Sequence, residues 1–322
     1  MKNIAVVCGG YSGEDIISRQ SAANVMENMD TSKYQAFVVE ISKNIWKAKV
    51  GKHWIAVDKN DFSFLHKDTK ITFDAVLMMI HGTPGENGLL QGYFSTLDLP
   101  VTTGDVLNMA LTFNKFATNA QLAKLNFNVA PNTMLQIGDE YNQNEILEQL
   151  QLPCFVKPNE AGSSLGISKV NEANQLEPAI KKAFEVNDSV MIEAFLKGRE
   201  IQCGVIPVNG KLQALAPTEI ISENEFFDFE AKYEGKSQEI TPANITEQQT
   251  KLIQETSEKI YKMLNCAGFV RIDYMLDNEK VQIIEINTVP GFSKMSILPQ
   301  QIKASGIEIK EALSQCIEQA LT

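Results

Sequence analysis

The chain has 322 residues, 44% of them hydrophobic, and a formal net charge of −11. This length predicts two or three domains, and the acidic balance without a Lys/Arg block argues against a nucleic-acid surface. No apolar run approaches a membrane span and the first residues lack a signal-peptide pattern, so we expect a cytoplasmic protein. The five scattered cysteines, without a CxxC pair, predict reduced core residues.

The first segment reads as an α/β unit. Residues 3–8 form a buried parallel-type strand, followed by a glycine loop at 9–14 and a helix over 16–29. A dinucleotide fingerprint is absent, because the loop has GGxxG spacing and lacks GxGxxG. Glu14 in this loop suits a cationic group such as an amine, and stabilisation of the first helical turn is an equally good interpretation.

Two further strands, over 37–41 and 75–80, continue this unit after a polar excursion. The second strand runs directly into the segment HGTPGENG, which begins at His81. Ligands of open α/β sheets bind at the carboxyl ends of strands, so His81 is a candidate site residue. A lone histidine is nevertheless more often structural.

The middle of the chain combines short strands with a helix. In order, the pattern predicts a helix over 108–123 and strands over 153–158, 167–170, 188–196 and 201–207. The small-residue loop 159–166 joins two strands, so it is not a P-loop, but its amides and hydroxyls can cradle phosphate oxygens. Lys157 supplies positive charge beside it, and a solvated hairpin turn is the alternative. Apolar residues at the end of the strand at 188–196 would suit an adenine ring, and Glu200 a ribose diol.

Residues 222–246 are polar and lack periodicity, which is typical of a functional lid. Four aromatic residues in this segment argue against disorder and would hold Lys232 and Tyr233 over a site. A helix over 247–264 follows, and the chain ends with a short helix from Ser296 and a final helix over 309–321.

The densest group of polar side chains lies in a hairpin, with strands over 269–275 and 280–286 and a turn at 276–279. Period-2 alternation places Arg271 and Asp273 on one face, and it gives Glu285 and Asn287 a common face on the partner strand. Such groups are costly inside a sheet unless something pairs with them. Two carboxylates and an amide oxygen suit Mg²⁺. A salt bridge between Arg271 and Asp273 is the alternative, and the convergence of four polar groups favours the metal.

Six segments together resemble the D-alanine–D-alanine ligase family of the ATP-grasp superfamily. They are GGYSGED, HGTPGENG, KPNEAGSSLGISKV, FDFEAKY, RIDYML and EINTVPGFSKMS, and they span essentially the whole chain. The resemblance implies an α/β chain, α+β in its C-terminal two-thirds, with three-domain ATP-grasp architecture. The expected domains are an N-terminal parallel-sheet domain over 1–103, a central subdomain over 104–193, and a C-terminal domain over 194–322 with the lid and the metal site.

The resemblance also implies residue roles. ATP would be bound by Lys115, Lys157, Gly162, Ser164, Glu193, Ala194, Leu196, Glu200 and Lys232. Two Mg²⁺ ions, with Mn²⁺ able to substitute, would be held by Asp273, Glu285 and Asn287. The ammonium of the first D-alanine would meet Glu14, supported by Ser163 and Tyr233, and His81 would lie near its carboxylate. The carboxylate of the second would meet Ser296 and Ile297, and the tetrahedral oxyanion would be stabilised by Arg271 and the Gly291 amide.

The implied reaction is ATP-dependent ligation of two D-alanines through an acyl phosphate, for peptidoglycan precursors, by a homodimer. Two departures from the family pattern, at 15–18 and at Lys294–Met295, lie beside the expected contacts, and Tyr233 favours an amine acceptor over D-lactate. Three alternatives remain: an ATP-grasp carboxylate–amine ligase with another acceptor, a nicotinamide dehydrogenase, and a non-catalytic nucleotide-binding regulator.

Overall fold

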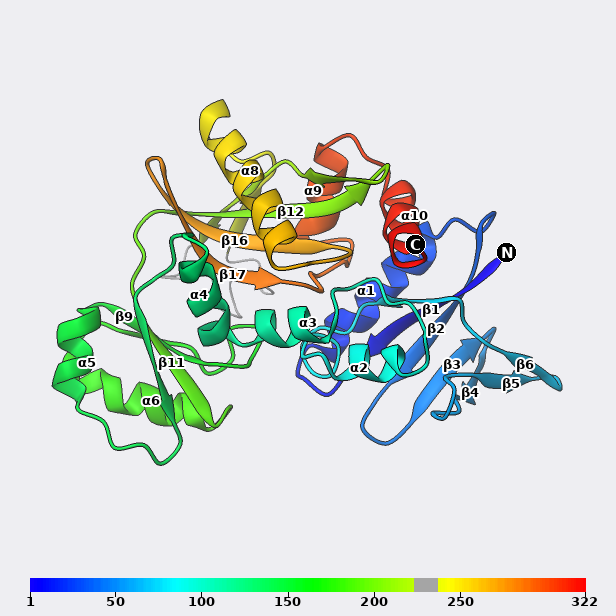
Figure 1. The fold of residues 1–322 in the computed structure, drawn as a ribbon, viewed down its shortest axis with the longest axis horizontal. Helices are drawn as coiled ribbons and strands as arrows, with labels where there is room; N and C mark the ends of the chain where they lie inside the picture. Colours follow the sequence, from blue (N-terminus) through cyan, green and yellow to red (C-terminus); the bar gives the residue numbers. More distant parts are fainter. Residues whose placement is uncertain (223–236) are drawn as a thin grey trace.

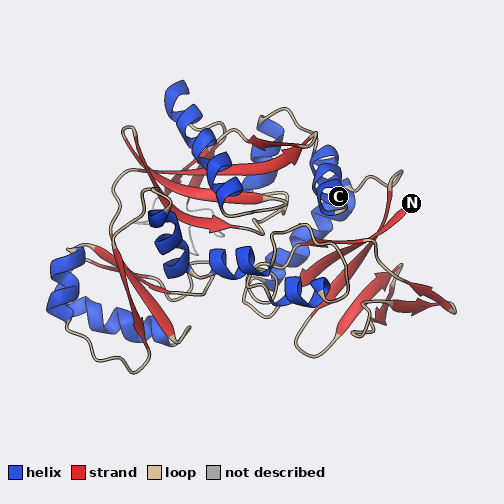
Figure 2. Cartoon of the chain, in the orientation of Figure 1, coloured by secondary structure: helices blue, strands red, loops and turns tan. Residues whose placement is uncertain are grey.

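The fold is taken from a computed structural model that describes residues 1–222 and 237–322. Three larger sheets with their helices form its main units (Figures 1 and 2). The N-terminal sheet has the order β4-β3-β2-β1-β7, with β1 parallel to both β2 and β7. The bounds are β1 Lys2–Gly9, α1 Asp15–Asn28, β2 Tyr34–Ile41, β3 Trp46–Val50, β4 His53–Ala56 and β7 Ala75–Met78. The predicted strand, loop and helix are thereby confirmed.

The predicted polar excursion contains strands that the sequence analysis missed. Besides β3 and β4, a small hairpin is formed by β5 Phe64–His66 and β6 Thr69–Ile71. An aromatic cluster that includes Phe37, Trp46 and Phe62 packs this region against α2 Leu89–Ser95. These strands are too short for their periodicity to be read from sequence.

The helix predicted over 108–123 is wrong as a single element. The structure has two helices, α3 Val106–Phe113 and α4 Lys115–Lys124, separated by Asn114 in an extended conformation with ψ 104°. The Asn114 side chain accepts a hydrogen bond from the N–H of Ala117, so it caps α4. Asparagine is favoured at this position because its side chain satisfies an N–H that the first helical turn leaves without a partner. The break places Lys115 at the start of a helix.

The central unit is a four-stranded antiparallel sheet of order β10-β9-β11-β8. Its bounds are β8 Asn132–Gln136, α5 Gln143–Leu150, β9 Cys154–Pro158, β10 Ser168–Val170, η1 Ala173–Gln175, α6 Leu176–Phe184 and β11 Ser189–Ala194. The predicted strands around loop 159–166 and at 188–196 are confirmed within two residues. One side of the sheet packs on α5 and α6 in a continuous apolar core.

The C-terminal sheet has the path β15-β14-β12-β16-β17, with β13 paired to β12. Its bounds, with the associated helices, are β12 Arg199–Val208, β13 Lys211–Ala214, β14 Thr218–Ser222, β15 Ser237–Ile240, α8 Glu247–Met263, β16 Val270–Asp277, β17 Lys280–Asn287, α9 Ile297–Ala304 and α10 Ile309–Ala320. The hairpin turn is shorter than predicted, because Leu276 and Asp277 still pair across the strands and Asn278 turns with φ 54°. The C-terminal part of the predicted lid contains a strand, because β15 lies within residues 222–246 and pairs with β14. Lys232 and Tyr233 lie outside the described residues.

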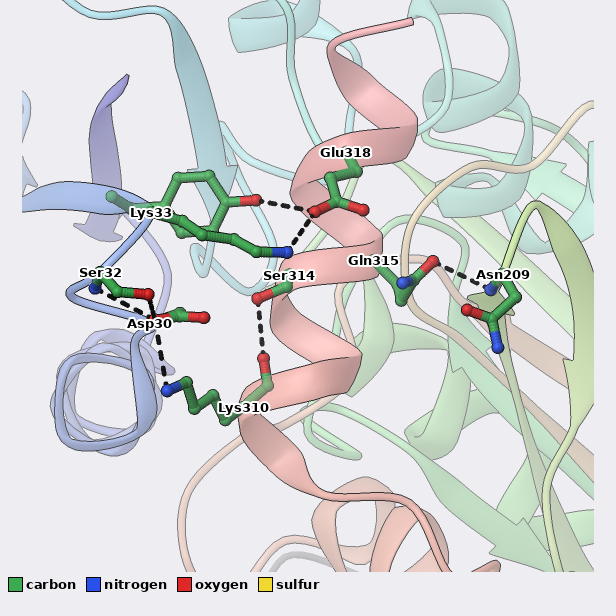
Figure 3. A network of polar contacts seen from close by, with 9 residues as sticks. Asp30, Ser32, Lys33, Asn209, Lys310, Ser314, Gln315 and Glu318 are labelled. Carbon is green, nitrogen blue, oxygen red and sulfur yellow. Dashed lines mark hydrogen bonds and ion pairs between the residues drawn. The ribbon is translucent and has the colours of Figure 1, made fainter. Parts of the chain in front are cut away.

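Helix α10 contacts both the N-terminal unit and the C-terminal sheet. Lys33 pairs with Glu318 at 2.8 Å, Lys310 pairs with Asp30 at 3.2 Å, and Gln315 accepts from the N–H of Asn209 at 2.9 Å (Figure 3). One apolar core also runs from β1 to the C-terminal helices. The N-terminal sheet and the C-terminal sheet are therefore held together through α10.

Two predictions from composition can be compared with the structure. All five cysteines are buried free thiols, which confirms the expected reduced core residues. Within the described ranges, no helix is long and apolar enough to cross a membrane.

Candidate active site

The small-residue loop 159–166 is fixed at its base by α4. The Lys115 N–H donates to the Asn159 carbonyl at 3.1 Å, and the Asn159 side chain accepts from the Phe116 N–H at 2.9 Å. The Lys115 ammonium donates to the Ala161 carbonyl at 2.5 Å. The structure thus brings Lys115 to the loop that the sequence predicts for phosphate binding.

Lys157 and Glu193 form a buried ion pair across β9 and β11. Burial opposes the charge of Lys157, but the carboxylate of Glu193, with weaker help from Glu285 and Glu200, raises the lysine's pKa above its usual value. The predicted phosphate ligand is therefore charged and already paired. The remaining adenine and ribose candidates follow along the chain: Ala194 ends β11, Leu196 lies in the link to β12, and Glu200 is the second residue of β12.

The predicted metal residues gather on one face of the β16–β17 hairpin. Asp273 lies opposite Glu285, Arg271 lies opposite Asn287, and the Asn287 side-chain amide is 3.3 Å from Asp273 Oδ2. The register shifts directly after this pair, between Asp273 and Tyr274, and such β-bulges re-aim side chains next to active sites. Among the described residues no group of three or more His, Cys, Asp or Glu side chains could hold a metal. The donor set here is smaller and chemically suitable for Mg²⁺: two carboxylates and an amide oxygen, which leave the other coordination positions of the ion to phosphate and water.

The salt bridge that was the alternative interpretation is also present. Arg271 donates from Nε to Asp273 Oδ1 at 2.8 Å and from Nη2 to Oδ2 at 2.9 Å. Burial disfavours the guanidinium charge, and Asp273 outweighs that cost, so the pKa of Arg271 is raised. These bonds use two of the five N–H groups of the guanidinium.

Glu14 meets the phosphate loop, although the two lie far apart in sequence. Glu14 is the N-cap of α1, and Ser163 donates to its Oε1 at 2.5 Å. Ser163 and Ser164 have φ of 51° and 57°, a region uncommon for serine. A Cβ on Gly162 would lie 2.5 Å from Glu14 Oε2, so a larger residue here would displace the Glu14 carboxylate or the loop. The structure therefore joins a candidate amine site to a candidate phosphate site.

His81 is buried with both ring nitrogens hydrogen-bonded inside the protein. Nδ1 lies 2.7 Å from the Val289 carbonyl, and Nε2 lies 3.1 Å from Ser21 Oγ. Burial lowers the pKa of His81, with Glu14 acting in the opposite sense. Its contact with a substrate carboxylate stays a prediction, whereas its contact with the 288–292 turn is observed.

Gly291 and Ser296 are neighbours after β17. A Cβ on Gly291 would lie 2.9 Å from Ser296 Oγ, and Ser293 Oγ lies 2.8 Å from the same hydroxyl. Ser296 is the N-cap of α9 and Ile297 its first residue. A helix start favours a carboxylate, because its backbone N–H groups lack partners within the helix.

Four residues at this site were missed as functional candidates. Glu86 accepts from the N–H groups of Gly82 and Val289, and Ser21 and Asn24 bind the backbone of Phe292. Asn159 anchors the phosphate loop. For Ser21 and Asn24 a signal existed, since small polar residues at 18, 21 and 24 interrupt the apolar face of the predicted helix.

Comparisons with known proteins agree with this geometry. A family model described as D-ala D-ala ligase N-terminus matches residues 3–104, and one described as D-ala D-ala ligase C-terminus matches 116–318. A D-alanine–D-alanine ligase of Flavobacterium johnsoniae is 44% identical over 322 residues, covering 100% of each chain. One of Phocaeicola vulgatus is 43% identical over 319 residues, covering 98% of each. The solved structure of the VanG D-Ala:D-Ser ligase from Enterococcus faecalis has a TM-score of 0.89 at 33% identity, covering 99% of each chain.

These matches cover the chain from end to end. Their sequence identities are well above the level at which proteins share only a fold. They also agree with the three-sheet architecture and with the resemblance predicted from the six motifs. The chain belongs to the D-alanine–D-alanine ligase family, and it is an ATP-dependent ligase with the ATP-grasp fold.

Proposed function

We propose that this protein joins two D-alanine molecules into D-alanyl-D-alanine for peptidoglycan precursors, converting ATP to ADP and phosphate. The observation that carries this proposal is the contact between Ser163 and Glu14. This contact supports a single site in which an amino acid, held by Glu14, lies against a nucleoside triphosphate, held by loop 159–166.

The first step activates a carboxylate, which is a poor electrophile. A carboxylate oxygen of the first D-alanine attacks the γ-phosphorus of ATP, the bond to the β-phosphate oxygen breaks, and ADP leaves. Glu14 orients the ammonium, and the charges of Lys115 and Lys157 balance the phosphates, so that positioning and electrostatics do most of the work. Asp273, Glu285 and Asn287 would hold two Mg²⁺ ions, or Mn²⁺ in their place, which neutralise phosphate charge when bound. Lys232 and Tyr233, with their segment, would cover the site and exclude water.

The second step forms the peptide bond. The deprotonated amine of the second D-alanine attacks the acyl carbon, and the tetrahedral intermediate collapses with loss of phosphate, which carries away the original carboxylate oxygen. Arg271 and the Gly291 N–H would stabilise the oxyanion, a role worth about 3–4 kcal/mol per donor in acyl transfer. Ser296 and the Ile297 N–H would receive the acceptor carboxylate at the start of α9.

The adenosine would lie where the central and C-terminal sheets are linked. Glu193, Ala194 and Leu196 would contact adenine, and Glu200 the ribose. Gly162 and Ser164 would lie over the phosphates. We also propose that the protein is cytoplasmic and forms a homodimer, and sedimentation of the purified protein would test the dimer.

A second candidate acceptor is D-serine, because the similar VanG structure is that of a D-Ala:D-Ser ligase. ADP release should be measured with D-alanine, with L-alanine, and with D-alanine plus D-serine or D-lactate, and the products identified by mass. Our proposal predicts turnover with D-alanine alone and D-alanyl-D-alanine as the main product in every mixture. Preferential formation of D-alanyl-D-serine or the ester would reassign the acceptor, and absence of ADP would overturn the proposal.

A further inference from the structure

The turn at residues 288–292 carries Gly291, the proposed oxyanion donor, and it is held by side chains of the N-terminal segment. Val289 and Phe292 flank the Pro290–Gly291 pair, and each has both its backbone N–H and its carbonyl bound. Glu86 Oε1 accepts from the Val289 N–H at 3.0 Å, and His81 Nδ1 lies 2.7 Å from the Val289 carbonyl. Four hydrogen bonds from residues more than 200 positions away therefore fix one five-residue turn.

The other two bonds come from α1. Ser21 Oγ accepts from the Phe292 N–H at 3.0 Å, and Asn24 Nδ2 donates to the Phe292 carbonyl at 2.8 Å. Ser21 and Phe292 are fully buried, and Asn24 is nearly so. Because these bonds lie away from solvent, losing one partner leaves a buried polar group unsatisfied, which costs about 1–3 kcal/mol.

The partners of His81 and Ser21 determine which atoms donate and which accept. A carbonyl only accepts, so the Nδ1 of His81 must carry the proton that faces Val289. In the neutral ring Nε2 is then an acceptor, and the Ser21 hydroxyl donates to it at 3.1 Å while accepting from Phe292. Burial of His81, which lowers its pKa, agrees with a neutral ring. Ser21 thus links both ends of the turn through His81.

Packing limits the remaining freedom of the turn. The ring of Phe292 stacks on Phe269 with centroids 5.2 Å apart, and Val289 is buried. Pro290 fixes its own φ, so few backbone torsions remain between the two held residues. The direction of the Gly291 N–H is therefore set by groups that belong to the N-terminal segment.

We propose that Ser21, Asn24 and Glu86 are positioning residues for acyl transfer, which hold the Gly291 N–H in the direction of the developing oxyanion. This inference rests on the proposed function. An oxyanion donor acts only if it already points at the place where charge develops, and one such donor is worth about 100- to 1,000-fold in rate. A turn that is held less tightly, but keeps the donor, should lose part of this rate factor, and kcat should fall about 10- to 100-fold.

The test is Ser21→Ala, with Ser257→Ala as matched control. Ser257 is equally buried and its hydroxyl lies 2.7 Å from the Tyr274 hydroxyl, but it has no contact with the 288–292 turn. Both variants lose a buried serine hydroxyl, so both should lower the melting temperature. Asn24→Ala, which frees the Phe292 carbonyl, provides a second variant that is judged by the same criteria if Ser21→Ala does not fold.

Four quantities are measured for each folded variant: kcat and KM with D-alanine, the Kd for ATP, and the inhibition constant of a phosphinate dipeptide whose tetrahedral phosphorus replaces the attacked carbon. We expect Ser21→Ala to lose about 10- to 100-fold in kcat and in phosphinate affinity, with the ATP Kd unchanged, and Ser257→Ala to keep kcat within about threefold. Equal kcat in the two variants would overturn the inference and leave Ser21 a purely structural residue. If the unmodified protein itself releases no ADP with D-alanine, the proposed function fails instead.

Discussion

Two sides of the site differ in how their polar groups are satisfied without ligand. On the side of the 288–292 turn, backbone groups are held by Ser21, Asn24, His81 and Glu86. On the opposite side, the cations that would meet phosphate or the oxyanion are bound to the protein's own oxygens: Lys157 to Glu193, Arg271 to Asp273 and Lys115 to the Ala161 carbonyl. The first side is ready for catalysis, whereas the second must share or exchange partners when a ligand arrives.

The difference follows from the cost of burying charge. A buried cation without a counter-ion is far more expensive than a buried neutral donor, so the cationic side needs partners in the free protein. Substitutions there should alter ligand binding and stability together. Substitutions on the turn side should alter kcat while ATP binding stays intact.

The largest effect is expected for Glu285→Gln. Replacing this carboxylate, which faces Asp273, leaves one carboxylate for the metal and should lower kcat about 1,000-fold. Binding of Mn²⁺, followed by its paramagnetic signal, should weaken in parallel. Glu279→Gln, at the exposed tip of the same hairpin, controls for the loss of one negative charge. Unchanged Mn²⁺ affinity in Glu285→Gln would remove this residue from the proposed metal site.

Lys157→Ala should weaken ATP binding and destabilise the protein at once. It leaves the buried Glu193 carboxylate without its cation, and breaking such a pair costs about 3 kcal/mol. Adding Glu193→Gln should restore part of the stability but not the ATP affinity. Denaturant unfolding and calorimetric ATP titration measure the two effects. The exposed pair of Lys181 and Glu177 gives the control, because Lys181→Ala should leave both nearly unchanged. A double variant less stable than Lys157→Ala would contradict this account of the pair.

Gly162→Ala tests the contact between the two sides. The new Cβ would lie 2.5 Å from Glu14 Oε2, so the Glu14 carboxylate or the loop must move, which disturbs the bond from Ser163 to Glu14. We expect about a tenfold loss of kcat/KM for D-alanine from this misplacement. Gly13→Ala is the control, since its Cβ would meet nothing within 4 Å. Equal kinetics in the two variants would show that the close approach has no role in turnover.

In stability, Glu86→Gln should give the smallest effect, visible in the pH dependence of the melting temperature. Burial, followed by repulsion from Glu14, raises the pKa of Glu86 from 4.5 to about 7. A carboxyl with a raised pKa binds more protons in the folded state, so its contribution to stability falls as pH rises from about 4.5 to about 7. The melting temperature should therefore fall less between pH 5 and pH 8 in Glu86→Gln than in the unmodified protein. Glu148→Gln, an exposed position on α5, should keep the unmodified slope, and an unmodified slope in Glu86→Gln as well would refute the assignment.

Much of the fold could be predicted because long strands and helices carry strong periodicity. The N-terminal β1 and α1, the strands around loop 159–166, and β16 and β17 were all found within a few residues. The break at Asn114 was missed because the apolar pattern continues through it and only a side-chain cap separates α3 from α4. Short strands such as β5 and β8 are fixed by their neighbours in the sheet, whereas the equally short β9 and β10 are marked in sequence by the small-residue loop between them.

The candidate site was predictable where chemistry concentrates in one segment. Asp273, Glu285 and Asn287 stand in a single hairpin, so alternation alone brought them together. The contacts of Ser21 and Asn24 with Phe292 join residues 271 and 268 positions apart, and no local pattern encodes such a contact. Arg271 illustrates a third case: a pair with Asp273 and a metal site are alternatives in the sequence analysis, although each Asp273 oxygen that accepts from Arg271 keeps a lone pair for a metal.

The acyl-phosphate route is tested most directly with D-alanine labelled by ¹⁸O in both carboxylate oxygens. The protein is incubated with ATP and this substrate, and the inorganic phosphate is examined by mass. Our account predicts one ¹⁸O atom in each phosphate released, because the oxygen that attacks the γ-phosphorus leaves with it. Dipeptide formed together with unlabelled phosphate would contradict the account.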